Sequence, residues 1–99
     1  MPALHLINAP SRTSPALANC LSAASTGDTV LLIENGVFCA VAATFAAISR
    51  KPAGVNWCAL VGDVRARGLE LRLAGSIAVV DDRAFVDLVA SHQPIVSWS

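Results

Sequence analysis

Cys20 is the residue whose type and position best suit chemistry. A cysteine thiolate can attack a sulfur donor and hold the transferred sulfur as a persulfide. Cys20 lies in a predicted helix that opens with Ser14 and Pro15, a good N-cap followed by a good first helical residue. It also borders the apolar stripe of that helix, beside Leu21 and one turn after Leu17. The residues alone leave two interpretations open, a reactive thiol and a packing side chain.

The other two cysteines lie in the most apolar parts of the chain. Cys39 falls within an apolar predicted helix and Cys58 within a predicted strand, so we expect both to be buried as small hydrophobic residues. Three cysteines without paired spacing fit a reducing compartment and argue against a disulfide scaffold.

The histidines do not form a metal-binding pattern. His5 and His92 are far apart in the sequence, whereas a zinc site needs three or four ligands, usually in close pairs. We therefore expect His5 to be a core or edge imidazole and His92 to be a charge at the end of a helix. Sulfur transfer by a thiol needs neither a metal ion nor an organic cofactor, and we expect none.

The acidic residues and the loops do not predict a nucleotide or hydrolase site. The first strand–helix loop, residues 8–13, lacks the glycines of a dinucleotide fingerprint or a P-loop, and no Gly-x-Ser-x-Gly elbow is present. Asp63, Asp81 and Asp82 follow predicted strands, where α/β sites form. A phosphoryl-accepting site needs a further acid after the first strand, where Asn8 stands. We interpret Asp81 and Asp82 as the N-cap of a helix.

Composition predicts a subunit of a larger assembly. The 99 residues make one domain, residues 1–99, of which 55% are hydrophobic and 14% charged, against about 25% charged in a typical domain. A small domain has much surface to cover, so this apolar excess predicts an exposed apolar patch, which is typical of protein interfaces. Seven basic and seven acidic residues cancel, which leaves no basic surface for nucleic acid.

The sequence also predicts a cytoplasmic location. Its beginning has no charged stretch followed by an apolar core, the pattern of a signal peptide. The longest apolar stretch, residues 37–48, is shorter than the roughly 20 residues that span a bilayer.

Short apolar runs alternate with helical patterns along the chain. The predicted strands are residues 3–7, 29–33, 56–61, 77–80 and 95–98. The predicted helical segments are residues 15–24, 37–50, 62–68 and one from Asp81 or Asp82 to Ser91. Strands that are apolar on both faces imply a sheet covered on both sides, and the alternation implies right-handed crossovers. The expected fold is a three-layer α/β/α sandwich with a mainly parallel sheet of about five strands.

Several segments together resemble the small sulfur-relay subunits called DsrH or TusB, within the DsrE/DsrF/DsrH-like (flavodoxin-like) fold group. Their order and spacing, more than any single motif, carry the resemblance. The matching segments are residues 4–8, 27–37, 40–42, 63–68, 79–82, 85–88 and Trp98. Asn35 departs from this pattern, because the family often has Asp there, but this should not matter for sulfur transfer.

The resemblance implies a heterohexamer with DsrE/DsrF-like (TusD/TusC-like) subunits, which hands sulfane sulfur from persulfide-carrying donors to acceptor proteins without direct contact with nucleic acid or membrane. Cys20 falls where the DsrH branch has a cysteine, nearer the sulfur-oxidation branch than the TusB branch that serves tRNA 2-thiouridine synthesis. The main sulfur-accepting cysteine of such complexes lies on the DsrE or TusD subunit. Two functions follow as hypotheses, a sulfur carrier through Cys20 and a non-catalytic subunit that supports assembly.

Overall fold

The computed structural model describes residues 1–99 and contains one five-stranded sheet. Every strand pair is parallel, in the order β4-β3-β2-β1-β5. The strands are β1 (Leu4–Ile7), β2 (Thr29–Leu32), β3 (Asn56–Leu60), β4 (Ala78–Val80) and β5 (Ile95–Trp98). This arrangement confirms the predicted α/β sandwich with a mainly parallel sheet.

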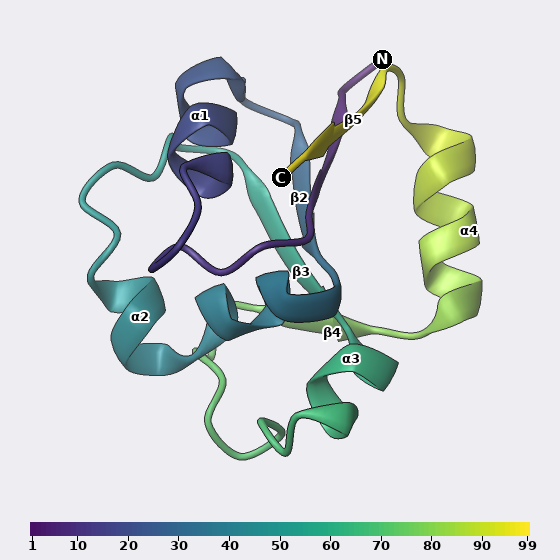
Figure 1. Ribbon diagram of the computed structural model, residues 1–99. Helices are drawn as coiled ribbons and strands as arrows, with labels where there is room; N and C mark the ends of the chain where they lie inside the picture. Colours follow the sequence, from purple (N-terminus) through teal and green to yellow (C-terminus); the bar gives the residue numbers. More distant parts are fainter.

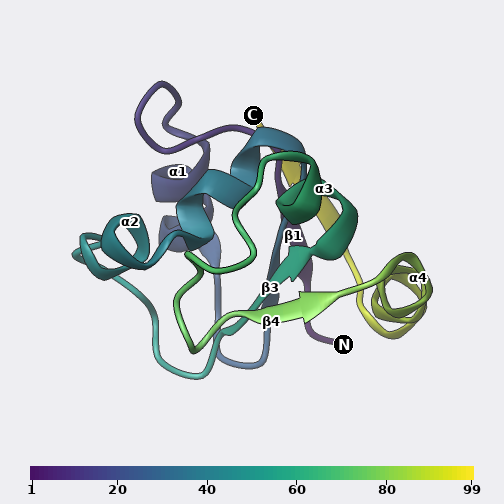
Figure 2. The same ribbon diagram turned by 90° about the horizontal axis from the view of Figure 1, so that it is seen from below.

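Helices lie on both faces of the sheet (Figures 1 and 2). They are α1 (Ala16–Ala23), the 3-10 helix η1 (Glu34–Ala40), α2 (Ala42–Ala46), α3 (Val61–Ala66) and α4 (Asp82–Ser91). The chain moves across the sheet from β1 to β4 with α1, η1 and α2 on one face, and returns to β5 through α4 on the other (Figure 2). Because every crossover is right-handed, helices that connect strands in one direction across the sheet lie on one face, and a helix that connects strands in the opposite direction lies on the other. No helix combines the length and the apolar character needed to cross a membrane.

The core is much larger on one face than on the other. Because side chains alternate along a strand, Val30 and Leu32 join a cluster of 16 buried residues under α1, η1 and α2. Leu31 points to the opposite face, into a cluster of only three buried residues beside α4. Phe85 and Leu88 of α4 pack against this small cluster but are only partly buried.

The helix predicted for residues 37–50 is wrong. The chain instead forms η1, then one extended residue, Val41, and then the short helix α2. The Ala42 N–H donates to the Arg72 carbonyl and the Ala40 carbonyl accepts from Ala74, both at 2.9 Å. Since the segment before β4 satisfies these backbone groups, a continuous helix is interrupted here despite the apolar sequence.

Asp81 is the N-cap of α4 as predicted, whereas the N-cap of α1 is Pro15 and not the predicted Ser14. The Ser14 hydroxyl accepts a 3.1 Å hydrogen bond from the Ala16 N–H at the start of α1. The Asp81 carboxylate accepts a 2.8 Å bond from the Ala84 N–H at the start of α4, which confirms its interpretation as an N-cap.

Candidate functional site: the surroundings of Cys20

Cys20 lies on the inner side of α1 and is fully buried in the larger core. Burial and, to a lesser extent, the negative charge of Asp28 together raise the pKa of the Cys20 thiol from 9.0 to about 12. The thiolate is the reactive form of cysteine, so Cys20 is a covered, protonated thiol at neutral pH. These surroundings match those of a packing cysteine.

Cys39 and Cys58 are also buried and free, as the sequence predicts. Burial is the main cause that raises the pKa of each thiol. Cys39 lies in the large cluster and Cys58 in the small one, on opposite faces of the sheet. The structure therefore gives none of the three cysteines an exposed, easily ionised thiol.

His5 belongs to a buried polar network near the ends of the chain. Its Nε2 lies 2.9 Å from Oδ2 of Asp28, and Trp98 Nε1 donates to its Nδ1 at 3.1 Å. Because Nδ1 accepts this bond, the imidazole carries its proton on Nε2 and donates it to Asp28. Both ring nitrogens are occupied, so His5 has no free nitrogen to serve as a base. This confirms the expectation of a core imidazole.

Asp28 holds the network together from the loop before β2. Its two carboxylate oxygens also accept the backbone N–H groups of Ala3 and Ser25, each at 3.0 Å. Burial raises the pKa of Asp28, but the hydrogen bonds from His5 and these two amides outweigh it and leave the pKa at about 2. Sequence reasoning did not predict that His5, Asp28 and Trp98 would meet. The sequence signal for these three residues is that each lies in a different segment of those that resemble the family.

His92 lies at the end of α4, where the sequence places it. Its Nδ1 is 2.7 Å from the Leu88 carbonyl, and its Nε2 is 2.9 Å from the Thr29 hydroxyl of β2. These contacts fasten α4 to the sheet. His92 is not brought near His5 as a ligand partner: no group of three or more His, Cys, Asp or Glu side chains has a geometry that could hold a metal ion.

Asp63 connects α3 to η1 rather than forming an acidic site. Its Oδ2 accepts a 2.7 Å bond from the Glu34 N–H. Arg67 lies 3.7 Å from the other carboxylate oxygen of Asp63 and donates a 3.0 Å bond to the Asn35 amide oxygen. Asn35, the departure from the family pattern, thus has a structural contact. Glu34 has a φ of 50°, and the bond to Asp63 helps to hold this left-handed conformation.

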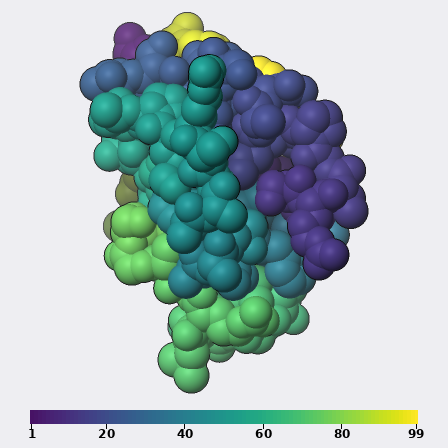
Figure 3. Space-filling model, turned by 90° about the vertical axis from the view of Figure 1, so that its left-hand side faces the viewer, coloured from purple at the N-terminus to yellow at the C-terminus, as the bar shows by residue number.

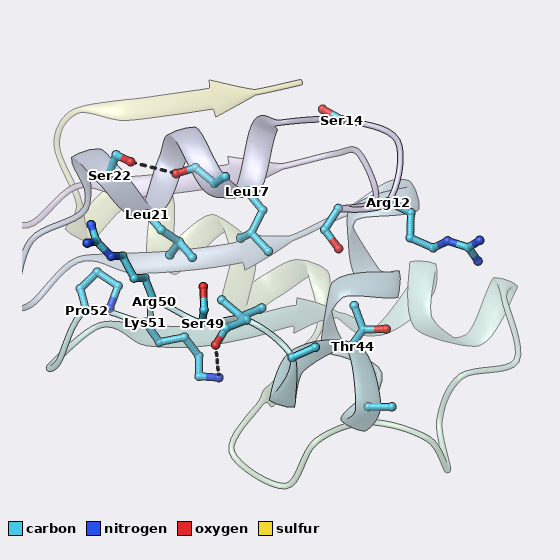
Figure 4. A pocket seen from close by; sticks show the side chains of 15 residues that line it. Arg12, Ser14, Leu17, Leu21, Ser22, Thr44, Ser49, Arg50, Lys51 and Pro52 are labelled. Atoms are coloured by element: carbon cyan, nitrogen blue, oxygen red, sulfur yellow. Dashed lines mark hydrogen bonds between the residues drawn. The ribbon is translucent and has the colours of Figure 1, made fainter.

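A groove of about 1160 Å³ runs between α1 and α2 (Figure 4). Leu17 and Leu21, which flank Cys20 on α1, contribute apolar side chains to it, whereas Cys20 itself does not line it. Arg12 and Arg50 lie at its two ends (Figure 4). Sequence reasoning did not find this groove, because α1 and α2 must be placed side by side before it exists.

The parallel sheet with helices on both faces is an α/β sandwich, compatible with the DsrE/DsrF/DsrH-like class of domains. Residues 10–95 match the family described as DsrH like protein. The chain is 36% identical to Protein TusB of Cronobacter sakazakii over 74 residues, 73% of this chain and 76% of that protein. It is 32% identical to Protein TusB of Sodalis glossinidius over 82 residues, 83% and 86% of the two chains. The chain therefore belongs to the DsrH/TusB family of sulfur-relay proteins.

Proposed function

We propose that this chain is a non-catalytic assembly subunit of a cytoplasmic sulfur-relay complex. It joins DsrE/DsrF-like (TusD/TusC-like) subunits in a heterohexamer, and sulfur travels as a persulfide on cysteines of its partners. The observation that carries the proposal is the full burial of Cys20 in a protein that exposes apolar side chains elsewhere.

The burial of Cys20 opposes both requirements of a sulfur carrier. In persulfide transfer, the acceptor thiolate attacks the outer sulfur of the donor, and the donor cysteine leaves as a thiolate. The Cys20 thiol is covered by its neighbours, and its pKa of about 12 keeps the thiolate scarce at neutral pH. A donor protein would have to displace part of α1 before Cys20 could react.

A surface for partners is present on the other side of the sheet. We define the α4 surface as Val86, Val89 and Ile95, whose exposed fractions are 67%, 42% and 40%. This surface lies over the face that has only three buried residues in its core. Exposed apolar side chains above a thin core are typical of a face that another protein covers. A partner seated there would bury these side chains and complete the layer.

The relatives favour one of the two pathways of the family. The two relatives described above are named Protein TusB, and the TusB branch serves the 2-thiouridine modification of transfer RNA. We therefore propose a relay that ends in tRNA thiolation. This differs from the expectation based on Cys20, whose position matches the DsrH branch.

Assembly is tested by placing charges on the α4 surface. The double variant Val86→Asp/Val89→Asp is compared with Leu71→Asp, because Leu71 is apolar, fully exposed and outside α4, in the loop before β4. Each protein is expressed with its DsrE/DsrF-like partners, and the complex is measured by size-exclusion chromatography with light scattering. We expect the double variant to lose the partners and Leu71→Asp to retain them. Retention by both variants, or loss by both, would contradict the proposal.

Sulfur handling is tested by mass spectrometry of the complex after exposure to a persulfide donor. The native complex is compared with one that carries Cys20→Ala. We expect added sulfur on a partner chain only, and equal transfer rates for both complexes. One sulfur atom on the native chain that is absent from the Cys20→Ala chain, together with slower transfer, would establish Cys20 as a carrier.

A further inference from the structure

We infer that the groove between α1 and α2 binds an acidic, partly apolar segment of another protein. The helices α1 and α2, which line the groove, lie on the opposite face of the sheet from α4 (Figure 2). Figure 3 shows this face, with residues 10–25 beside residues 40–55. The inference does not depend on assembly through α4, because the two surfaces share no residue.

The groove is positively charged although the chain is neutral. Its lining includes Arg12, Arg50 and Lys51, and it includes no aspartate or glutamate. The sequence has no acidic residue in 1–27 or in 35–62, the segments that contain α1, α2 and the loop after α2. None of the seven acids lines the groove, so no carboxylate in its lining compensates the positive charge. An occupant with negative charge is the complementary one.

The positions of the cations indicate an elongated occupant. Arg12 lies at one end of the groove and Arg50 at the other (Figure 4), so an elongated occupant is the one that can contact both. Lys51 is partly engaged, since its ammonium donates to the carbonyls of Phe45 and Ile48 at the end of α2. The volume of about 1160 Å³ also exceeds the roughly 300–1,000 Å³ of typical small-molecule sites.

The walls of the groove fit a polypeptide better than a nucleic acid. The half-buried Ile48 supplies apolar contact area, and the exposed small residues Ala18 and Ala47 allow a backbone to approach closely. Leu17 and Leu21 border the groove but are buried in the core. No aromatic side chain lines the groove, so it offers no stacking platform for bases. Apolar contacts between charged ends are typical of grooves that take an amphipathic segment.

The experiment is a selection of random peptides, displayed on phage, on the immobilised full chain. The best peptide is then measured by fluorescence anisotropy against Arg12→Glu, Arg50→Glu and Arg83→Glu. The three arginines are all exposed, and Arg83 is the matched control because it lies on α4. We expect enriched peptides to be rich in Asp and Glu with interspersed apolar residues. Each groove variant should weaken binding about tenfold at low salt, with a smaller loss at high salt, and Arg83→Glu should not.

A variant that blocks the groove distinguishes binding within it from attraction to its positive charge alone. Ala18→Trp fills the groove from α1 without changing the charge, and circular dichroism checks that it folds. We expect it to abolish peptide binding. The inference would be overturned if no peptide is enriched, if enriched peptides lack acidic residues, or if Arg83→Glu weakens binding as much as the groove variants. Displacement of the peptide by poly(U) RNA would likewise overturn it in favour of nucleic acid.

Discussion

The two faces of the sheet differ in how completely they are packed. Under α1, η1 and α2, 16 buried residues form a continuous core, whereas the face under α4 has three, and α4 itself has no buried residue. Adjacent residues of one strand, Leu31 and Leu32, therefore support layers of very different extent. The first face is complete within the chain, and the second leaves Val86 and Val89 of α4 exposed. Stability and assembly should accordingly respond to substitutions on opposite sides of the molecule.

Removal of one leucine from each face should have very different effects on stability. Leu32 is fully buried in the large cluster, so Leu32→Ala should lower the free energy of unfolding by about 2–5 kcal/mol. Leu88 is only partly buried on α4, and Leu88→Ala should cost about 1 kcal/mol in the isolated chain. Urea unfolding of the two variants measures both costs. Equal costs would show that the α4 face is as well packed as the other.

The Asp28 network should make the stability of the well-packed face depend on pH. The folded state lowers the pKa of Asp28 from 3.8 to about 2, so its stabilising effect is complete above pH 3.8 and is lost as the pH falls toward 2. In the native chain both carboxylate oxygens of Asp28 accept a backbone N–H. Asp28→Asn replaces one of these oxygens by an amide nitrogen, which cannot accept, and this should lower the free energy of unfolding by about 1–3 kcal/mol at neutral pH.

Urea midpoints of the native chain and Asp28→Asn, measured between neutral pH and pH 2, check this expectation. The native chain should lose more stability than the variant over the acidic range, so the two curves should converge. Parallel curves would mean that another carboxylate controls the acid response.

The sequence was sufficient to predict the sheet but not the interrupted second helix. The strand predicted for residues 95–98 coincides with β5, and that predicted for residues 29–33 extends β2 by one residue. Local apolar patterns encode such strands. The break at Val41 depends instead on hydrogen bonds with Arg72 and Ala74, which are distant in the chain. No pattern within residues 37–50 contains that information.

The candidate site shows the same limit. The sequence placed Cys20 at the margin of an apolar stripe, but its complete burial depends on how α1 packs on the sheet. His5 and Trp98 are 93 positions apart in the chain and His5 and Asp28 are 23 apart. Their pairing follows from the parallel alignment of β1 with β2 and β5. Single candidate residues could therefore be identified from the sequence, but the residues that they contact could not.

Substitution of Cys20 tests whether the core under α1, η1 and α2 tolerates a polar atom. Cys20→Ser places a hydroxyl in a fully buried position and should cost about 1–3 kcal/mol, whereas Cys20→Ala should cost less because it adds no polar group. Alanine is therefore the better substitution for studies of sulfur transfer. Thermal unfolding compares the two variants.

Alkylation by iodoacetamide gives an independent measure of the same burial. The Cys20 thiol should react only after urea unfolding, because it is covered and its pKa is about 12 in the folded chain. Rapid labelling of Cys20 in the native protein, located by peptide mapping, would show that α1 opens readily and would favour a sulfur carrier.

The smallest expected effect concerns α4. This helix has no buried residue, and hydrogen bonds at its two ends stabilise it instead. Asp81 accepts the Ala84 N–H at the start of this helix, and His92 fastens its end to β2 through Thr29. Asp81→Ala should therefore cost about 1 kcal/mol in the isolated chain. Hydrogen exchange should locate the loss in α4 and leave α1 unchanged, because the two helices lie on separate cores. If partners cover the α4 surface, assembly should restore the protection of this helix in the variant. An equal loss of protection in α1 would mean that the two faces unfold as one unit.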